Sequence, residues 1–340
     1  MKPLASLSLD LDNEWSYLKT HGDVQWEALP SYLDVVVPRA LDLLSSLDLT
    51  ITFFIVGQDA ALERNHEAIT ALSRAGHEIG NHSFHHEPWL QRYSEAQVRD
   101  EFSRTEDALS ALTGVVPVGF RGPGFSLSPT VLSVLSERGY VYDASTFPTI
   151  VGPLARAFYF RTSKLDAAQR EERADLFGGA SDALRPLSPY RWDVGADGII
   201  EIPVTTIPGL RVPFHVSYLL YLAGRSPAIA RSYFRTGLAL CRAARVAPSI
   251  LLHPLDLLGG DDVQSLSFFP GMAMSGKEKR ELVSGFLTLF ADRFEICTMG
   301  EHAASLAGST LPTVAPGARR PASRLIKHGG AKPGLVGNRR

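Results

Sequence analysis

The chain has 340 residues, of which 45% are hydrophobic and 21% are charged. This composition supplies enough apolar side chains for a sizeable core, which excludes intrinsic disorder over most of the chain. The 34 Lys and Arg residues nearly balance the 36 Asp and Glu residues, giving a formal net charge of −2. A nucleic-acid-binding protein usually carries a strong basic excess, so we expect no nucleic-acid partner.

The N-terminus and the two cysteines predict a cytoplasmic protein. The first residues run directly into an alternating stretch, without the apolar region and cleavage site of a secretory signal. No apolar run is long enough to span a membrane. Cys241 and Cys297 are too few for a disulfide framework, so we expect both to be buried packing residues in a reducing compartment.

Predicted strands and helices alternate along most of the chain. Residues 7–12 alternate apolar and polar side chains, and residues 50–56 are β-branched and aromatic, so both segments are predicted strands. A capping box of Ser94 and Gln97 predicts the start of a helix over residues 94–112. Further helices are predicted over residues 30–47, 59–74, 128–138 and 277–291, and further strands over 77–80, 118–120, 140–142, 199–202, 249–252 and 294–296.

This order predicts an α/β fold with a parallel sheet and crossover helices, either open or closed into a barrel. We expect one catalytic domain over residues 1–306, interrupted by a Pro- and Gly-rich insertion over residues 148–199. Residues 307–340 contain Gly, Pro, Ser and basic residues without periodicity, which predicts a disordered basic tail.

The first predicted strand carries carboxylates on one face. Residues two apart on a strand share a face, so Ser8, Asp10 and Asp12 point one way and the leucines between them point the other. Strands of a parallel sheet are normally apolar on both faces, so aligned carboxylates need a metal, another cation or solvent. Taken alone, the segment fits a metal or catalytic site and a turn with solvated carboxylates equally well.

A histidine cluster follows in the segment GHEIGNHSFHH, residues 76–86, which contains four of the ten histidines. His82 and His86 are four residues apart, so on a helical turn both imidazoles would face the same way and could hold one metal. His82 and His85 also fit by spacing alone. With Asp12 the cluster supplies one carboxylate and two imidazoles, a donor set suited to Zn²⁺ or a similar divalent cation.

Two further polar residues follow predicted strands, where α/β proteins place their sites. Arg121 lies in the segment FRGPGF, and His253 lies in the segment LLHP. Taken alone, Arg121 is more typical of a solvated turn residue, and His253 is more typical of a structural residue.

Together these motifs resemble the polysaccharide deacetylase family, also called the NodB homology domain or carbohydrate esterase 4. The resemblance rests on the order Asp-x-Asp, His-Ser-x-x-His, Arg-x-Pro and Leu-x-His, and GHEIGNHSFHH is its most specific part. It extends from Leu7 to the helix near Ala291. The resemblance implies a distorted (β/α) barrel with the site at the carboxyl ends of the strands.

The resemblance also implies the chemistry. Asp12, His82 and His86 correspond to ligands of a divalent metal, for which we expect Zn²⁺. The implied reaction is attack of a metal-bound water on an amide, which removes an acetyl or formyl group from an amino sugar.

The remaining motif residues take the other roles that the resemblance implies. Asp10 corresponds to the general base, and Arg121 to the residue that orients it. His253 corresponds to the general acid that protonates the leaving amine, and Leu251 shapes the acyl pocket.

The sequence departs from the family pattern at three places. Leu11 separates Asp10 and Asp12, which is typical of the cytoplasmic branch rather than of the commoner motif with adjacent aspartates. Gly124 stands where an aromatic residue usually follows the proline. The usual Asp-Trp motif is not evident, and Asp143 is the candidate in its place for orienting a site residue.

Basic residues gather in two segments. Residues 202–255 contain six Arg and no Asp, Glu or Lys, and the predicted tail adds seven basic residues and no acids. Such segments can contact an anionic membrane, although a buried helix followed by a solvated Arg-bearing helix explains the first one slightly better. We therefore expect a lipid-linked substrate, such as a polyprenyl-phosphate-linked sugar, or a nucleotide-linked one, with peripheral contact at the inner face of the membrane.

Three other functions compete with this reading. An allantoinase-like hydrolase of a small non-sugar amide would share the fold. A 2-His-1-carboxylate Fe(II) oxygenase would use the same ligand types, but it usually has an antiparallel β scaffold. A non-catalytic carbohydrate-binding relative would be expected to lack the base or a ligand, and none of the motif residues is missing.

Overall fold

The computed structural model describes residues 2–152, 160–161, 163, 165, 170–171 and 182–317. The strands in this part of the chain are β1 (Leu4–Leu11), β2 (Thr52–Ile55), β3 (Glu78–Asn81), β4 (Gly119–Phe120), β5 (Tyr142–Asp143), β6 (Tyr190–Trp192), β7 (Ile199–Glu201), β8 (Ser249–Leu252), β9 (Glu295–Cys297) and β10 (Thr313–Val314). The α-helices are α1 (Glu14–His21), α2 (Leu33–Ser46), α3 (Gly57–Ala60), α4 (His66–Arg74), α5 (Glu95–Thr113), α6 (Pro129–Glu137), α9 (Val216–Ala223), α10 (Pro227–Ala244), α11 (Gly276–Ala291) and α12 (Met299–Ser305).

Short 3-10 helices lie between these elements: η1 (Val24–Ala28), η2 (Glu63–Asn65), η3 (Leu90–Arg92), η4 (Pro123–Phe125), η5 (Asp182–Leu184), η6 (Pro254–Asp256) and η7 (Gln264–Leu266).

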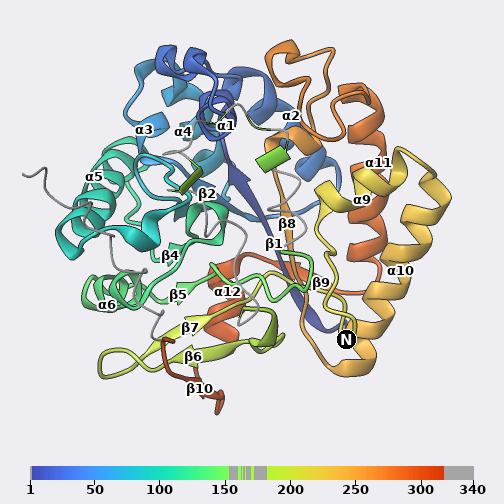
Figure 1. Ribbon diagram of the computed structural model, residues 1–340. Coiled ribbons are helices and arrows are strands. Elements are labelled where there is room, and N and C mark those ends of the chain that lie inside the picture. The colour runs from blue at the N-terminus through green and yellow to red at the C-terminus, as the bar shows by residue number, and fades with distance from the viewer. Residues whose placement is uncertain are drawn as a thin grey trace, which may run out of the picture.

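One sheet organises the fold. Its strand order is β10-β6-β7-β5-β4-β3-β2-β1-β8, and β9 also pairs with β1. Among the described strands, β6 and β7 pair antiparallel and the other pairs are parallel. The sheet curls into a half-barrel with helices around its outside, α3 to α6 on one side and α9 to α11 on the other (Figure 1). The predicted α/β class and distorted (β/α) barrel are thereby confirmed.

The central strand β1 separates the core from the site. Leu7, Leu9 and Leu11 are almost completely buried in the main hydrophobic core, which also includes the inward faces of α2, α10 and α11. Ser8 and Asp10 alternate with them, so they point to the opposite face, as the period of a strand requires. The predicted division of this strand into an apolar and a polar face is confirmed.

Most predicted elements occur within a few residues of their expected bounds, including the helix α5 with its Ser94–Gln97 capping box. The predicted helix over residues 59–74 is instead divided into α3, η2 and α4. The Asn65 side chain donates to the backbone carbonyl and to the carboxylate of Asp59, and Leu62 is extended. These local side-chain hydrogen bonds compete with a continuous helix.

Ordered structure continues beyond the predicted boundary at residue 306. Thr313 and Val314 form β10, which pairs with the edge strand β6, itself within the predicted insertion. Arg191 N–H donates to the Pro312 carbonyl and Asp193 N–H to the Val314 carbonyl, at 2.8 and 3.0 Å. The predicted disorder is therefore wrong for residues 313 and 314. Residues 318–340, and most of residues 153–181 in the predicted insertion, lie outside the described residues.

Both cysteines are buried free thiols, as predicted. Burial raises the pKa of Cys241 and of Cys297 to about 12, so neither is a reactive thiolate at neutral pH. Within the part of the chain that the structure describes, no helix has the length and apolarity to cross a bilayer.

Candidate metal and catalytic site

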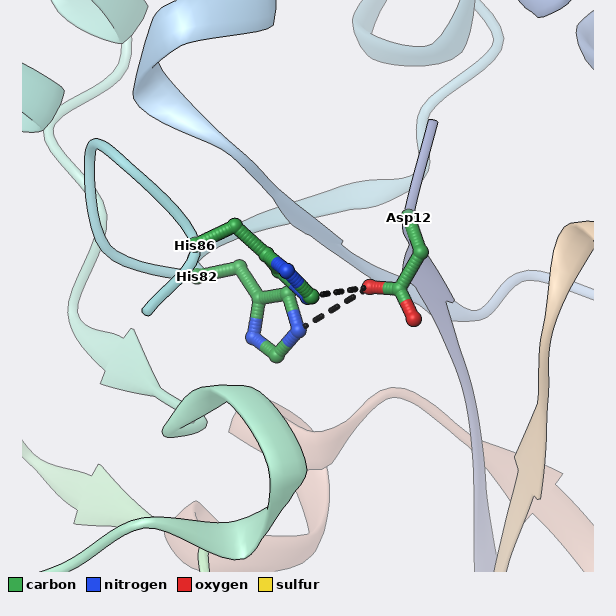
Figure 2. A group of neighbouring side chains, drawn as sticks. All are labelled: Asp12, His82 and His86. Carbon is green, nitrogen blue, oxygen red and sulfur yellow. Dashed lines mark hydrogen bonds and ion pairs between the residues drawn. The ribbon is translucent and has the colours of Figure 1, made fainter. Parts of the chain in front are cut away.

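Asp12, His82 and His86 come together at the carboxyl ends of β1 and β3 (Figure 2). Oδ1 of Asp12 lies 2.9 Å from Nε2 of His86 and 3.2 Å from Nε2 of His82. All three residues are buried, and their nearest ligand atoms lie within 4.8 Å of one another. The three side chains predicted as metal ligands therefore form one compact cluster.

The predicted helical turn between the two histidines is wrong. Residues 82–86 form a loop in which Ser83 and His86 have φ angles of 60° and 51°. These left-handed conformations are incompatible with a right-handed helical turn, and both imidazoles reach the Asp12 carboxylate without one. Ser83 N–H donates to Oδ1 of Asn81 at 2.8 Å, which ties the start of this loop to the end of β3.

Glu101 on α5 holds the middle of the same loop. Its Oε2 accepts hydrogen bonds from the backbone N–H groups of Phe84 and His85, at 2.7 and 2.9 Å. Its Oε1 lies 2.5 Å from Nδ1 of His85, so the His85 side chain binds Glu101 and is not part of the metal cluster. Burial of Glu101 would raise its pKa, but these bonds from His85 and Phe84 outweigh burial and lower it. The alternative pair His82 and His85 is therefore wrong.

The cluster fits a divalent cation. Nδ1 of His82 lies 2.6 Å from the carbonyl oxygen of Arg121, an acceptor, so this nitrogen carries the proton and Nε2 presents a lone pair to Asp12. A lone pair facing a carboxylate needs a proton or a cation between them. Two imidazole nitrogens and one carboxylate oxygen are ligands that Zn²⁺ and related ions accept.

The directions in which the pKa values of Asp12 and His82 are shifted also indicate that the cluster favours a positive charge. Burial of Asp12 would raise its pKa, but His86 and His82 outweigh burial and lower it well below the usual value. Burial of His82 would lower its pKa, yet Asp12 and Asp10 raise it. The site therefore stabilises a buried positive charge, which a bound cation would supply.

Asp10 and Arg121 form a buried ion pair beside this cluster. Nη1 of Arg121 donates to Oδ1 of Asp10 and to Oγ of Ser8, each at 2.7 Å. Nε of Arg121 donates to the carbonyl of Ala144 at 3.0 Å, and its guanidinium lies 4.4 Å from the centre of the Phe54 ring. Arg121 is fully buried, so the reading of a solvated turn residue is wrong.

His253 reaches the same edge of the sheet from β8. The parallel register pairs Leu9 of β1 with Leu252 of β8. Asp10 and His253 each directly follow one member of this pair, so they lie side by side at the ends of the two strands. His253 is half-buried, and its Nδ1 lies 3.1 Å from Oγ of Ser217. Leu251, predicted to shape an acyl pocket, is completely buried.

A second pair of carboxyl groups was not predicted as a pair. Asp143 and Glu201 lie opposite each other on β5 and β7, and burial raises the pKa of both. Asp143 accepts from Oγ of Ser145 at 2.5 Å, and this Oγ accepts from Gly122 N–H at 2.8 Å. Glu201 accepts from Nε1 of Trp192 at 2.9 Å. Asp143 thus supports the loop that follows Arg121, whereas the ring of His253 is bonded to Ser217.

Comparison with known proteins agrees with this geometry. Residues 26–142 match the polysaccharide deacetylase family model. The segment over residues 26–142 is therefore similar to polysaccharide deacetylases. The chain is 35% identical over 101 residues to a chitin deacetylase from Pestalotiopsis sp., covering 29% of this chain and 34% of the relative. It is 30% identical over 104 residues to a peptidoglycan-N-acetylglucosamine deacetylase from Bacillus cereus, covering 31% of this chain and 37% of the relative.

A solved structure extends the likeness in fold to most of the chain. A Mycobacterium smegmatis protein, provisionally named as a polysaccharide deacetylase, superposes with a TM-score of 0.58 at 22% identity. The match covers 95% of this chain and 99% of that one. The curated relatives, in contrast, are matched over about a third of their length.

Proposed function

We propose that this protein is a metal-dependent hydrolase that removes an acetyl or formyl group from the nitrogen of an amino sugar. The observation that carries the proposal is the buried Asp12–His82–His86 cluster beside a second carboxylate, Asp10, that Arg121 holds. One carboxylate is thus available as a ligand and the other as a base. Relatives named as deacetylases of chitin and of peptidoglycan N-acetylglucosamine support an N-acylated amino sugar as the substrate.

A divalent cation in the cluster, for which we propose Zn²⁺, would polarise the amide carbonyl and lower the pKa of a nearby water. Asp10 takes a proton from the attacking water as the new carbon–oxygen bond forms. His253 gives a proton to the amide nitrogen as the carbon–nitrogen bond breaks, which releases a carboxylic acid and a free amine. The base and the acid come from neighbouring strands, β1 and β8.

Arg121 determines which atom of Asp10 can act. Its Nη1 donates a hydrogen bond to Oδ1 of Asp10 at 2.7 Å, which leaves Oδ2 of Asp10 to accept the proton. The guanidinium is itself held by Ser8 and by the Ala144 carbonyl, so the base has one orientation. Arg121 therefore positions the base and does not contact the reacting atoms in this scheme.

The test is removal of an acyl group from defined amino sugars. Protein loaded with Zn²⁺ is incubated with N-acetyl and N-formyl amino sugars in free, nucleotide-linked and polyprenyl-phosphate-linked form, and products are followed by mass spectrometry. We expect wild type to release the acyl group and Asp10→Asn to be about 10²- to 10⁴-fold slower, because it loses the base. The exposed Asp292, at the end of α11, provides the matched control Asp292→Asn, which should keep wild-type turnover.

Two outcomes would contradict this assignment. Unchanged turnover in Asp10→Asn would eliminate Asp10 as the base. Hydrolysis of a small non-sugar amide with none of the sugars would instead favour an allantoinase-like hydrolase. Oxygenation that requires Fe(II) and an oxoacid would favour the 2-His-1-carboxylate oxygenase.

We further propose that the enzyme is cytoplasmic, that its substrate is lipid-linked, and that it contacts the anionic inner face of the membrane. Arg231, Arg235 and Arg242 are exposed at positions of α10 that share one side of a helix. Arg235 and Arg293 line a surface hollow together with Leu240, which combines positive charge with apolar surface. Each basic residue near an anionic surface contributes roughly 1 kcal/mol of attraction.

This membrane contact is tested with vesicles of defined composition. We expect the full chain to sediment with phosphatidylglycerol-containing vesicles and not with pure phosphatidylcholine vesicles, and to dissociate as salt increases. Changing Arg231, Arg235 and Arg242 together to Gln should weaken this binding, and so should deletion of residues 318–340. Equal recovery with both kinds of vesicle, or none with either, would contradict the proposal.

A further inference from the structure

The imidazole of His253 is connected to a buried carboxyl group through a serine. Ser217 lies in the first turn of α9, and its Oγ is 3.1 Å from Nδ1 of His253. The same serine hydrogen-bonds the side chain of Asp256, which is 2% exposed in η6. Oδ2 of Asp256 also accepts the backbone N–H of His253 at 2.8 Å. Asp256 therefore restrains both the backbone and, through Ser217, the ring of His253.

The other ionisable groups around His253 leave Asp256 as its carboxylate. Asp10 on β1 is already paired with Arg121. Burial and the nearby His253 lower the pKa of His215 to about 3, so this neighbour is neutral. Burial and Asp12 raise the pKa of Tyr17 from α1 well above its usual value, so it stays protonated.

A buried lysine completes the surroundings. Nζ of Lys279 on α11 donates to the carbonyls of Leu255 and Leu258, each at 2.8 Å. This ammonium group lies close enough to lower the pKa of Asp256, against the larger effect of burial that raises it. The ammonium group of Lys279 is thus bonded to two carbonyls, and its charge favours the carboxylate form of Asp256.

We propose that Ser217 and Asp256 are positioning residues for His253. In this arrangement Nδ1–H of His253 donates to Oγ of Ser217, and the Ser217 hydroxyl donates to the Asp256 carboxylate. Nε2 is then the atom that holds the transferable proton, and the negative charge of Asp256 stabilises the imidazolium through the hydroxyl. The inference rests on the proposed role of His253 as the acid.

The arrangement is tested first without catalysis. In full-length protein loaded with Zn²⁺, the pKa of His253 is measured by NMR from its ring signals, assigned with His253→Asn. We expect Ser217→Ala and Asp256→Asn each to make protonation of His253 about tenfold weaker, which is one pKa unit. Ser217→Thr, which keeps the hydroxyl, should retain the wild-type value. Ser232 is exposed on α10, and Ser232→Ala is the matched control.

The kinetic counterpart is the pH dependence of turnover. A general acid must be protonated to act, so activity is lost as the pH rises and His253 loses its proton. If His253 binds its proton more weakly, this loss of activity begins at a lower pH. We expect kcat/KM at neutral pH to fall about tenfold in Ser217→Ala. The decrease should come from kcat, and KM should change little. Ser217→Thr should restore both the rate and the position of the high-pH limb.

The two proposals fail in different experiments. If Ser217→Ala leaves the NMR titration of His253 unchanged, the positioning role is overturned, whatever the activity of His253→Asn. If His253→Asn keeps full turnover while Ser217→Ala still shifts the titration, the proposed acid is overturned and the hydrogen-bonded chain stands. Should Asp256→Asn fail to fold, as judged by its thermal transition, Ser217→Ala and Ser217→Thr still decide the question.

Discussion

Replacing Asp12 by Asn should remove most of the affinity for a divalent cation. Oδ1 of Asp12 is the atom that both imidazoles face, so it joins the two halves of the cluster. An amide oxygen carries no formal charge and leaves two neutral imidazoles as the remaining ligands. We expect the affinity for Zn²⁺ to fall by more than about 100-fold, since even the loss of a residue that only supports a ligand costs 10- to 100-fold. Competition with a chromophoric chelator measures this change directly.

His85 provides the control for this experiment. It belongs to the same loop as His82 and His86, but its Nδ1 binds Glu101 and not the cluster. The affinity of His85→Gln for Zn²⁺ should therefore be within a few-fold of that of wild type. Its turnover should also be close to that of wild type. Loss of metal in His85→Gln together with retention in Asp12→Asn would show that the ligand set is wrong.

Replacing Arg121 by Ala should destabilise the fold by about 3–5 kcal/mol, the usual cost of breaking a buried ion pair by removing one partner. Arg121 is fully buried and Asp10 is 4% exposed, so the variant leaves a carboxylate with little access to water. It also leaves the Ala144 carbonyl without its donor and a gap against the Phe54 ring. Urea denaturation of wild type and variant measures the difference in the free energy of unfolding.

Two further variants identify the cause of that loss. Arg138 pairs with Glu106 at the surface, so Arg138→Ala should cost no more than about 1 kcal/mol. The double variant Asp10→Asn with Arg121→Ala removes the stranded charge and should recover part of the stability lost in Arg121→Ala. If Arg121→Ala is no less stable than Arg138→Ala, the buried pair does not hold this part of the sheet together.

The sequence predicted the residues of the site better than their local conformation. Alternation along β1 placed Asp10 and Asp12 correctly, because the period of a strand determines which residues share a face. The spacing of His82 and His86 identified two members of the cluster, but it suggested a helical turn. The chain instead takes left-handed conformations at Ser83 and His86. The spacing of residues along the sequence does not predict such conformations.

The supporting residues could not be predicted, because only the folded chain brings them near the site. Glu101 lies on α5, where a glutamate would ordinarily be expected on the solvent face of a surface helix. Ser217 and Asp256 meet His253 only because α9 packs against η6. The strand β10 is two residues long, too short for any alternation, and it forms because the edge of β6 offers unpaired backbone groups.

The anchoring of the ligand loop by Glu101 has a consequence for how a metal would bind. Two backbone N–H groups and one imidazole fasten the loop between His82 and His86 to a helix that is 19 residues long. The conformational entropy of ordering this loop is therefore lost when the chain folds, before any cation arrives. Glu101, which is not a member of the Asp12–His82–His86 cluster, would thus preorganise that cluster for a metal. Mutations of α5 distant from the reacting atoms should then act on metal retention, and a screen for variants with altered metal affinity should find them there.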